Sequence, residues 1–152
     1  MTFKYLFFAL ASFLMVLVTS CGEEADPLPE TRSLLINRNW RMTAMTASAG
    51  NDQTYDLYNN TEGLQACDKD DLWVFADNNY YEKDEGLTMC DSTASQIYET
   101  GTWQLEGNSL TMQRNSTTQK AYTIEEITPT TLRLQNISEG AANTTFSLTF
   151  SL

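Results

Sequence analysis

The sequence contains no histidine among its 152 residues. This absence excludes catalysis by Ser-His-Asp or Cys-His groups and every metal site that needs an imidazole ligand. A pair of carboxylates could in principle hydrolyse a glycosidic bond, but the sequence places no acidic residue in an aromatic pocket. The sequence accordingly predicts a protein that is not an enzyme and that binds no cofactor.

Positive charge is also scarce. Lys and Arg together number nine, whereas Asp and Glu number 20, which gives a net charge of −11 at neutral pH. A surface of this charge repels nucleic acid and anionic lipid head groups. We therefore exclude nucleic acid as a partner.

A long apolar run occurs only at the N-terminus. Lys4 precedes an apolar run over residues 5–18, which is shorter than the about 20 residues of a membrane-spanning helix. The arrangement is typical of a secretory signal. Residues 18–21 (Val-Thr-Ser-Cys) resemble a lipobox, which predicts a lipoprotein signal peptide over residues 1–20 and lipidation of Cys21. An ordinary cleaved signal beside an unrelated cysteine is the less favoured alternative.

The lipidated residue predicts where the protein resides. Several acyl chains on Cys21, palmitate among them, would anchor the protein stably to a membrane. Residues 21–32 are acidic, contain two prolines and lack apolar periodicity, which indicates a solvated tether. The acidic residues serve either as a plain spacer or as a surface-export signal. We therefore expect a lipid-anchored protein of the cell envelope, in the outer membrane on its periplasmic side or at the cell surface.

Three cysteines are present in total. Lipidation of Cys21 leaves Cys67 and Cys90 as a pair in an oxidising compartment, which predicts a disulfide. Such a bridge would stabilise the fold by about 3 kcal/mol on the chain-entropy model. In the alternatives, the two cysteines bind a metal ion together, or one of them is a nucleophile and the other has no role. A thiolate metal site normally has four ligands, which disfavours the first of these.

Residues 33–152 are long enough for one domain with a hydrophobic core. No segment after the signal has a sustained helical period, although residues 31–37 could form one helical turn. Residues 49–65 read as a long loop that could hold a helical turn near residues 55–58. The remaining apolar residues alternate with polar ones, as in half-buried strands. The predicted strands are 39–48, 72–76, 80–83, 100–105, those around 110–112, 122–124 and 132–134, and 143–152.

About eight strands of this kind, joined mostly by tight turns, must close on themselves or stack on a second sheet. Sequential hairpins of similar length favour closure. The predicted fold is therefore all-β, an antiparallel up-and-down barrel of about eight strands.

Several segments together resemble the bacterial lipocalin-like domain family, in the same order and spacing over most of residues 33–152. They are the Leu-Leu…Trp segment 34–40, the cysteine–acidic–aromatic segment 67–75, Gly86 with Cys90, the Gly-x-Trp and Gly-Asn hairpin 101–111, and residues 122–124 and 130–134. The resemblance implies a small β-barrel on a secreted or lipid-anchored protein. Arg38 stands where the family usually has glycine, which leaves the form of the turn before Trp40 open.

The barrel interior is the first candidate site, because an eight-stranded barrel either is filled by side chains or holds one small ligand. The short strands and large side chains favour a filled interior, and no polar residue stands out at an inward position. The inward residues expected to line a ligand site are Trp40, Met42, Trp103, Leu105, Met112, Tyr122, Leu134, Phe146 and Phe150. Leu110, Ile124, Leu132 and Leu148 are expected to face inward as well.

The second candidate is an acidic group beside the predicted disulfide. Its members are Asp68, Asp70, Asp71, Glu85 and Asp91. Carboxylate oxygens suit calcium, but the spacing is not that of an EF-hand loop. A solvated acidic rim is the favoured interpretation, and no metal is expected.

Two functions follow from these patterns. The first is a lipid-anchored barrel that binds a small apolar ligand. The second is a non-enzymatic interaction module whose filled barrel presents loops, above all residues 49–65, to envelope partners or glycans.

Overall fold

A computed structural model describes residues 28–49, 53–60, 63–138 and 144–152 of the chain. The predicted signal peptide, Cys21 and residues 22–27 of the predicted tether lie outside the described residues. Helix α1 (Leu28–Leu35) is followed by strand β1 (Asn39–Ala49) and strand β2 (Gln53–Asp56). The next elements are the 3-10 helix η1 (Cys67–Lys69), β3 (Leu72–Phe75), β4 (Tyr80–Asp84), β5 (Ile97–Glu106), β6 (Ser109–Gln113), β7 (Gln119–Ile127), β8 (Thr131–Ser138) and β9 (Thr144–Ser151).

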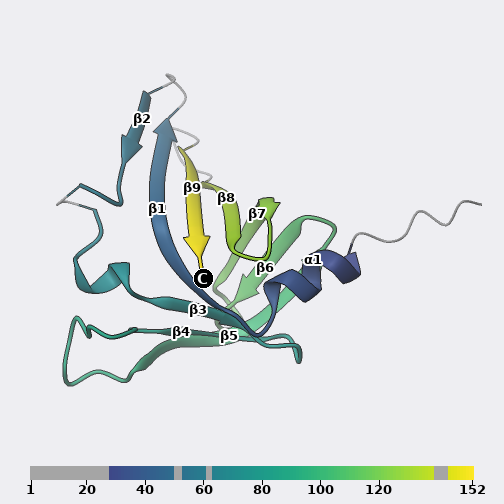
Figure 1. The fold of residues 1–152 in the computed structure, drawn as a ribbon, viewed down its shortest axis with the longest axis horizontal. Helices are drawn as coiled ribbons and strands as arrows, with labels where there is room; N and C mark the ends of the chain where they lie inside the picture. Colours follow the sequence, from purple (N-terminus) through teal and green to yellow (C-terminus); the bar gives the residue numbers. More distant parts are fainter. Residues whose placement is uncertain (1–27, 50–52, 61–62, 139–143) are drawn as a thin grey trace, which may run out of the picture.

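The strands form one antiparallel sheet in the order β2-β1-β3-β4-β5-β6-β7-β8-β9. β1 also pairs with β9, from Arg41 opposite Ser151 to Ser48 opposite Thr145, and this pairing closes the sheet. β1 and β3–β9 therefore form a closed eight-stranded up-and-down barrel, with β2 as an extra strand on β1 (Figure 1). The fold predicted from the alternation of apolar residues is confirmed.

The second half of β1 does not pair with β3, as it would in a regular barrel. β1 pairs with β3 only through Asn39–Arg41 and with β2 only through Thr46–Ala49. Figure 1 shows β1 and β3 diverging beyond their short pairing. Between these two pairings, Met45 accepts backbone hydrogen bonds from Leu57 and Tyr58. The segment that connects β2 to β3 therefore completes the wall where β3 departs from β1.

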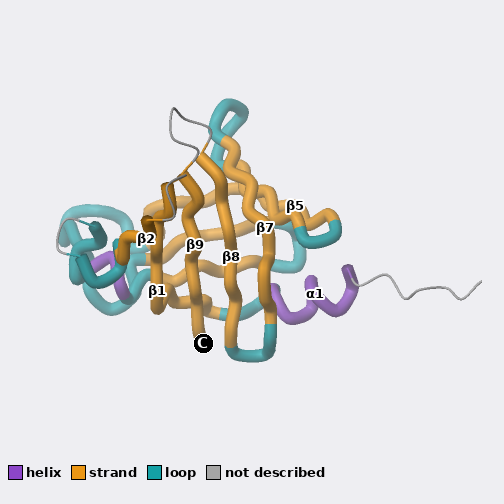
Figure 2. The backbone as a smooth tube through the Cα atoms, turned by 90° about the horizontal axis from the view of Figure 1, so that it is seen from above, coloured by secondary structure: helices purple, strands orange, loops and turns teal. Residues whose placement is uncertain are grey.

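Large apolar side chains alternate along the strands and fill the part of the barrel near α1. Trp40 and Trp103 are fully buried, and the Phe75 ring lies edge-on to Trp103 with 5.7 Å between ring centroids. Leu35 of α1 is also fully buried, and its carbonyl accepts a hydrogen bond of 2.9 Å from Nε1 of Trp40. Helix α1 therefore closes this part of the barrel. Figure 2 shows α1 on the opposite side of the molecule from β2 and the neighbouring loops.

Two local predictions need correction. The helix runs over Leu28–Leu35, so it begins inside the predicted tether rather than at residue 31. Proline is tolerated in a first helical turn, which accommodates Pro29 there. The predicted loop 49–65 contains the strand β2, in place of the helical turn expected near residues 55–58.

The turn before Trp40 takes its positive φ at Asn37, where φ is 55°. Asparagine tolerates this left-handed conformation better than most residues. Arg38 therefore does not need the freedom of glycine, and its Nη1 instead donates a hydrogen bond of 2.6 Å to the carbonyl of Pro129.

The predicted disulfide between Cys67 and Cys90 is confirmed, with 5.2 Å between the two Cα atoms. It joins η1 to the connection between β4 and β5. No helix among the described residues is both long and apolar enough to cross a membrane.

Candidate functional site

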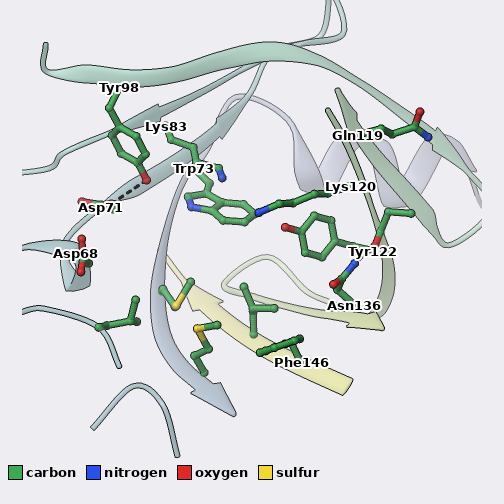
Figure 3. Close-up of a pocket in the computed structure, with 15 residues that line it drawn as sticks. Asp68, Asp71, Trp73, Lys83, Tyr98, Gln119, Lys120, Tyr122, Asn136 and Phe146 are labelled. Atoms are coloured by element: carbon green, nitrogen blue, oxygen red, sulfur yellow. Dashed lines mark hydrogen bonds between the residues drawn. The ribbon is translucent and has the colours of Figure 1, made fainter. Parts of the chain in front are cut away.

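A cavity of about 850 Å³ opens into the barrel beside the segment that separates β1 from β3. Its apolar wall comes mainly from β1, β3 and β9, and its polar wall from β4, β5, β7, β8 and the segment around η1 (Figure 3). The lining residues are Met42, Met45, Leu64, Asp68, Asp71, Trp73, Lys83, Tyr98, Gln119, Lys120, Ala121, Tyr122, Asn136, Phe146 and Leu148.

The expectation of a filled interior is wrong for this part of the barrel. That expectation assumed that neighbouring strands stay paired along their whole length, so that large side chains meet across a narrow barrel interior. β1 and β3 instead separate after three residue pairs, and the connecting segment closes the gap with Leu64 and Asp68. The space between them is not filled by the side chains of the described residues.

The structure divides the residues predicted to face inward into three sets. Met42, Tyr122, Phe146 and Leu148 line the cavity. Met112 lines a smaller cavity of about 150 Å³ that shares Lys83, Lys120 and Tyr122 with the first. The others belong to the packed core and do not line the main cavity: Trp40, Trp103, Leu110, Ile124, Leu132, Leu134 and Phe150 are buried, and Leu105 is half-buried against them.

A buried lysine stands at an inward position, contrary to the expectation that no polar residue would. Lys83 is 7% exposed, and its Nζ lies 2.9 Å from Oε1 of Glu99 and 4.2 Å from the centre of the Trp73 ring. Burial lowers the pKa of Lys83, although the hydrogen bond to Glu99 opposes this shift. Burial would raise the pKa of Glu99, but hydrogen bonding and the charge of Lys83 outweigh it and hold that pKa below its usual value.

Two tyrosines surround this ion pair. Tyr81 donates a hydrogen bond of 3.0 Å to Oε1 of Glu99, the same oxygen that faces Lys83. Burial and the charge of Glu99 raise the pKa of Tyr122 to about 12, so its hydroxyl keeps its proton at neutral pH. Among the described residues, that hydroxyl has no hydrogen-bond partner, and it lies within the cavity (Figure 3).

An acidic group occupies the other side of the cavity. Tyr98 donates a hydrogen bond of 2.8 Å to Oδ2 of Asp71, whereas Oδ1 of Asp71 is buried without a partner among the described residues. Burial raises the pKa of Asp71 to about 6, and the nearby charges of Glu85, Asp68 and Asp70 act in the same direction. The solvated acidic rim expected here is wrong for Asp71, which is half-buried and lines the cavity.

Among the described residues, the structure does not bring the carboxylates of Asp68, Asp70, Asp71 and Asp91 together as one group. Asp68, Asp70 and Asp91 each accept a backbone hydrogen bond, from Gln65, Leu87 and Thr93 respectively. Within the described part of the chain, the one group that brings three potential ligand atoms together is Asp68 with Cys67 and Cys90. Both of those sulfurs are consumed by the disulfide, so this group has too few ligands for a metal.

The profile of the lipocalin-like domain matches residues 36–134, which is more than half of the chain. The chain therefore belongs to the lipocalin-like domain family, in agreement with its closed eight-stranded barrel. Folds of this kind typically bind or carry ligands and are not enzymes. No curated protein and no solved structure matches the chain.

Sequence reasoning missed Trp73, Lys83, Lys120 and Tyr98 as cavity residues. A signal for Lys83 was present, because Lys83 lies two positions after Tyr81 in a predicted strand and therefore shares its face. In the structure, these two side chains are the buried ones of β4. A lysine on the apolar face of a strand is a candidate for a buried, paired charge. No comparable signal existed for Tyr98. It lies near the start of β5, before the part of that strand that pairs with β6, and its side chain lines the cavity.

Proposed function

We propose that this protein is a cell-envelope lipoprotein that holds a small, mainly apolar ligand inside its lipocalin-like barrel. The observation that carries the proposal is the cavity of about 850 Å³. Its volume falls within the range of about 300–1,000 Å³ typical of ligand sites. Met42, Met45 and Leu148 offer apolar contact, and polar side chains such as Asp71, Lys120 and Asn136 also line the cavity.

The expected location supports the same proposal. A lipobox-like sequence that ends at Cys21 would attach the barrel to the outer membrane, on its periplasmic side or at the cell surface. A tethered carrier would take up its ligand from, or deliver it to, the compartment around that membrane. The alternative of a filled barrel that presents its loops to partners or glycans loses its premise, because this barrel contains a cavity.

The proposal predicts that the purified protein binds a neutral, polarity-sensitive dye such as Nile red, with enhanced dye fluorescence. Met45→Trp places a large ring in the cavity from a half-buried position, so we expect dye affinity to fall about tenfold or more. Met45→Leu nearly conserves the side-chain volume and is the matched control, with affinity within about twofold of the parent.

Circular dichroism establishes that both variants keep the β fold. Equal dye affinity in a folded Met45→Trp variant and in the parent would contradict binding in this cavity. Mass spectrometry under native conditions, on protein isolated from its own host, then measures the mass of any ligand that remains bound.

A further inference from the structure

Cationic side chains gather at one part of the cavity wall although the chain as a whole is strongly acidic. Lys83 and Lys120 line both the main cavity and the smaller one, and Arg114 lines the smaller one. Among the residues that line the smaller cavity, Glu99 is the one acid. Three positive charges therefore face one negative charge, within a protein whose net charge is −11.

Glu99 does not neutralise all three cations. Its Oε1 receives both Lys83 and the hydroxyl of Tyr81. Within the described part of the chain, Lys120 and Arg114 form no ion pair, and no side-chain hydrogen bond is present at either. The hydroxyl of Tyr122 adds a further donor without a partner among the described residues. This part of the wall therefore offers donors and positive charge but lacks a matching acceptor.

The cations also repel one another. Burial is the main cause that lowers the pKa of Lys83, and the positive charges of Lys120 and Arg114 act in the same direction. An anion bound between them would relieve this repulsion, whereas a neutral or cationic group would not. The acceptor oxygens of a carboxylate or a phosphate also match the unused donors.

The apolar and acidic walls fix which way such a ligand would lie. Figure 3 shows Asp68 and Asp71 on one side of Trp73, and Lys120 and Tyr122 on the other. An anion is repelled from the first side and attracted to the second. Met42, Met45 and Leu148 line the main cavity and offer apolar contacts to the chain of such a ligand.

We propose that the ligand is an amphiphile with an anionic head group, bound with that head group between Lys120 and Tyr122 and with its apolar chain in the main cavity. This inference rests on the proposed function, because it assumes that the cavity holds a ligand. It adds that, among ligands with apolar chains of equal size, the protein prefers those with an anionic head group.

The test compares three probes with the same alkyl chain and different head groups: dodecanoate, dodecanol and dodecylammonium. Isothermal titration calorimetry of the purified protein at neutral pH and low ionic strength measures each dissociation constant. We expect dodecanoate to bind about tenfold more tightly than dodecanol, and dodecylammonium most weakly, since a charge-assisted hydrogen bond discriminates by about this factor. Added salt should weaken dodecanoate binding and leave dodecanol nearly unchanged.

The residue-level test is Lys120→Gln, at an exposed position where the substitution leaves the core intact. It should raise the dissociation constant of dodecanoate about tenfold and that of dodecanol by less than about twofold. Arg133→Gln is the matched control, because it removes one positive charge from the exposed pair with Glu126, outside both cavities. This control should bind dodecanoate like the parent.

The outcomes separate the two proposals. Equal affinities for dodecanoate and dodecanol, a preference for dodecylammonium, or unchanged dodecanoate binding in Lys120→Gln would each overturn the head-group site while leaving ligand binding in place. Failure of all three probes and of the neutral dye would overturn both proposals.

Discussion

At the scale of single residues, the half-buried Asp71 sets a pH dependence of stability. Its pKa is raised from 3.8 to about 6 in the folded protein, mainly by burial. The folded state therefore retains a proton between these pH values where the unfolded chain has lost it. The stabilisation from this proton is fully present below about pH 4 and is lost as the pH rises through about 6.

Asp71→Asn removes the charge and keeps an oxygen that can accept the hydrogen bond from Tyr98. We expect its melting temperature to exceed that of the parent by a few degrees near neutral pH, and the difference to shrink toward about pH 4. Differential scanning calorimetry across this range provides the measurement. Asp91→Asn is the control, because Asp91 is exposed and its pKa is lowered by hydrogen bonds from Thr93. A melting temperature for Asp71→Asn at or below that of the parent near neutral pH would contradict the prediction.

At the scale of elements, the disulfide is the strongest local constraint on the segment beside the cavity. It links η1, where Asp68 lines the cavity, to the connection between β4 and β5 across a separation of 23 residues. The double variant Cys67→Ser/Cys90→Ser should lower the free energy of unfolding by about 3 kcal/mol, because the unfolded chain gains loop entropy.

Urea titration followed by tryptophan fluorescence measures this change. A reducing agent should destabilise the parent by a similar amount and have no effect on the double variant. If the variant and the oxidised parent have the same free energy of unfolding, the bridge does not stabilise the fold.

The elements also show what the sequence can predict. Strands with one apolar face were predictable, because Trp103 and Leu105, or Phe146, Leu148 and Phe150, repeat at a period of two. β2 was not predictable in this way. All four of its side chains are exposed, so the strand has no apolar face that would produce an alternating pattern. The Gly-x-Trp motif of the family has a packing reason: a Cβ on Gly101 would lie 2.2 Å from the carbonyl oxygen of Gln113.

The cavity was harder to predict than the barrel. Closure follows from the need to bury an apolar face on every strand, which is a property of each segment by itself. The cavity depends on where β1 parts from β3, and that is set by a register of only three residue pairs. The donors around Lys83 come from β4, from β7 and, for Arg114, from the connection between β6 and β7, and only the three-dimensional fold brings them together.

At the scale of the whole molecule, the net charge bears on the proposed attachment to a membrane. Removal of residues 1–20 would take away Lys4 and no acidic residue, so that eight basic and 20 acidic residues remain and the net charge becomes −12. A protein of this charge is repelled by anionic lipid surfaces. The proposed attachment to an anionic membrane would therefore depend on covalent lipid at Cys21, because the surface of the barrel does not favour it.

This argument makes Cys21 decisive for location. In the native host, we expect the parent protein to sediment with membranes, and Cys21→Ser to lose its acyl chains and leave the membrane pellet after the signal is removed. Mass spectrometry of the N-terminal peptide measures the acylation directly. The double variant Cys67→Ser/Cys90→Ser is the control, since it keeps Cys21 and should remain acylated. A parent protein without acyl chains on Cys21 would disprove the proposed anchor.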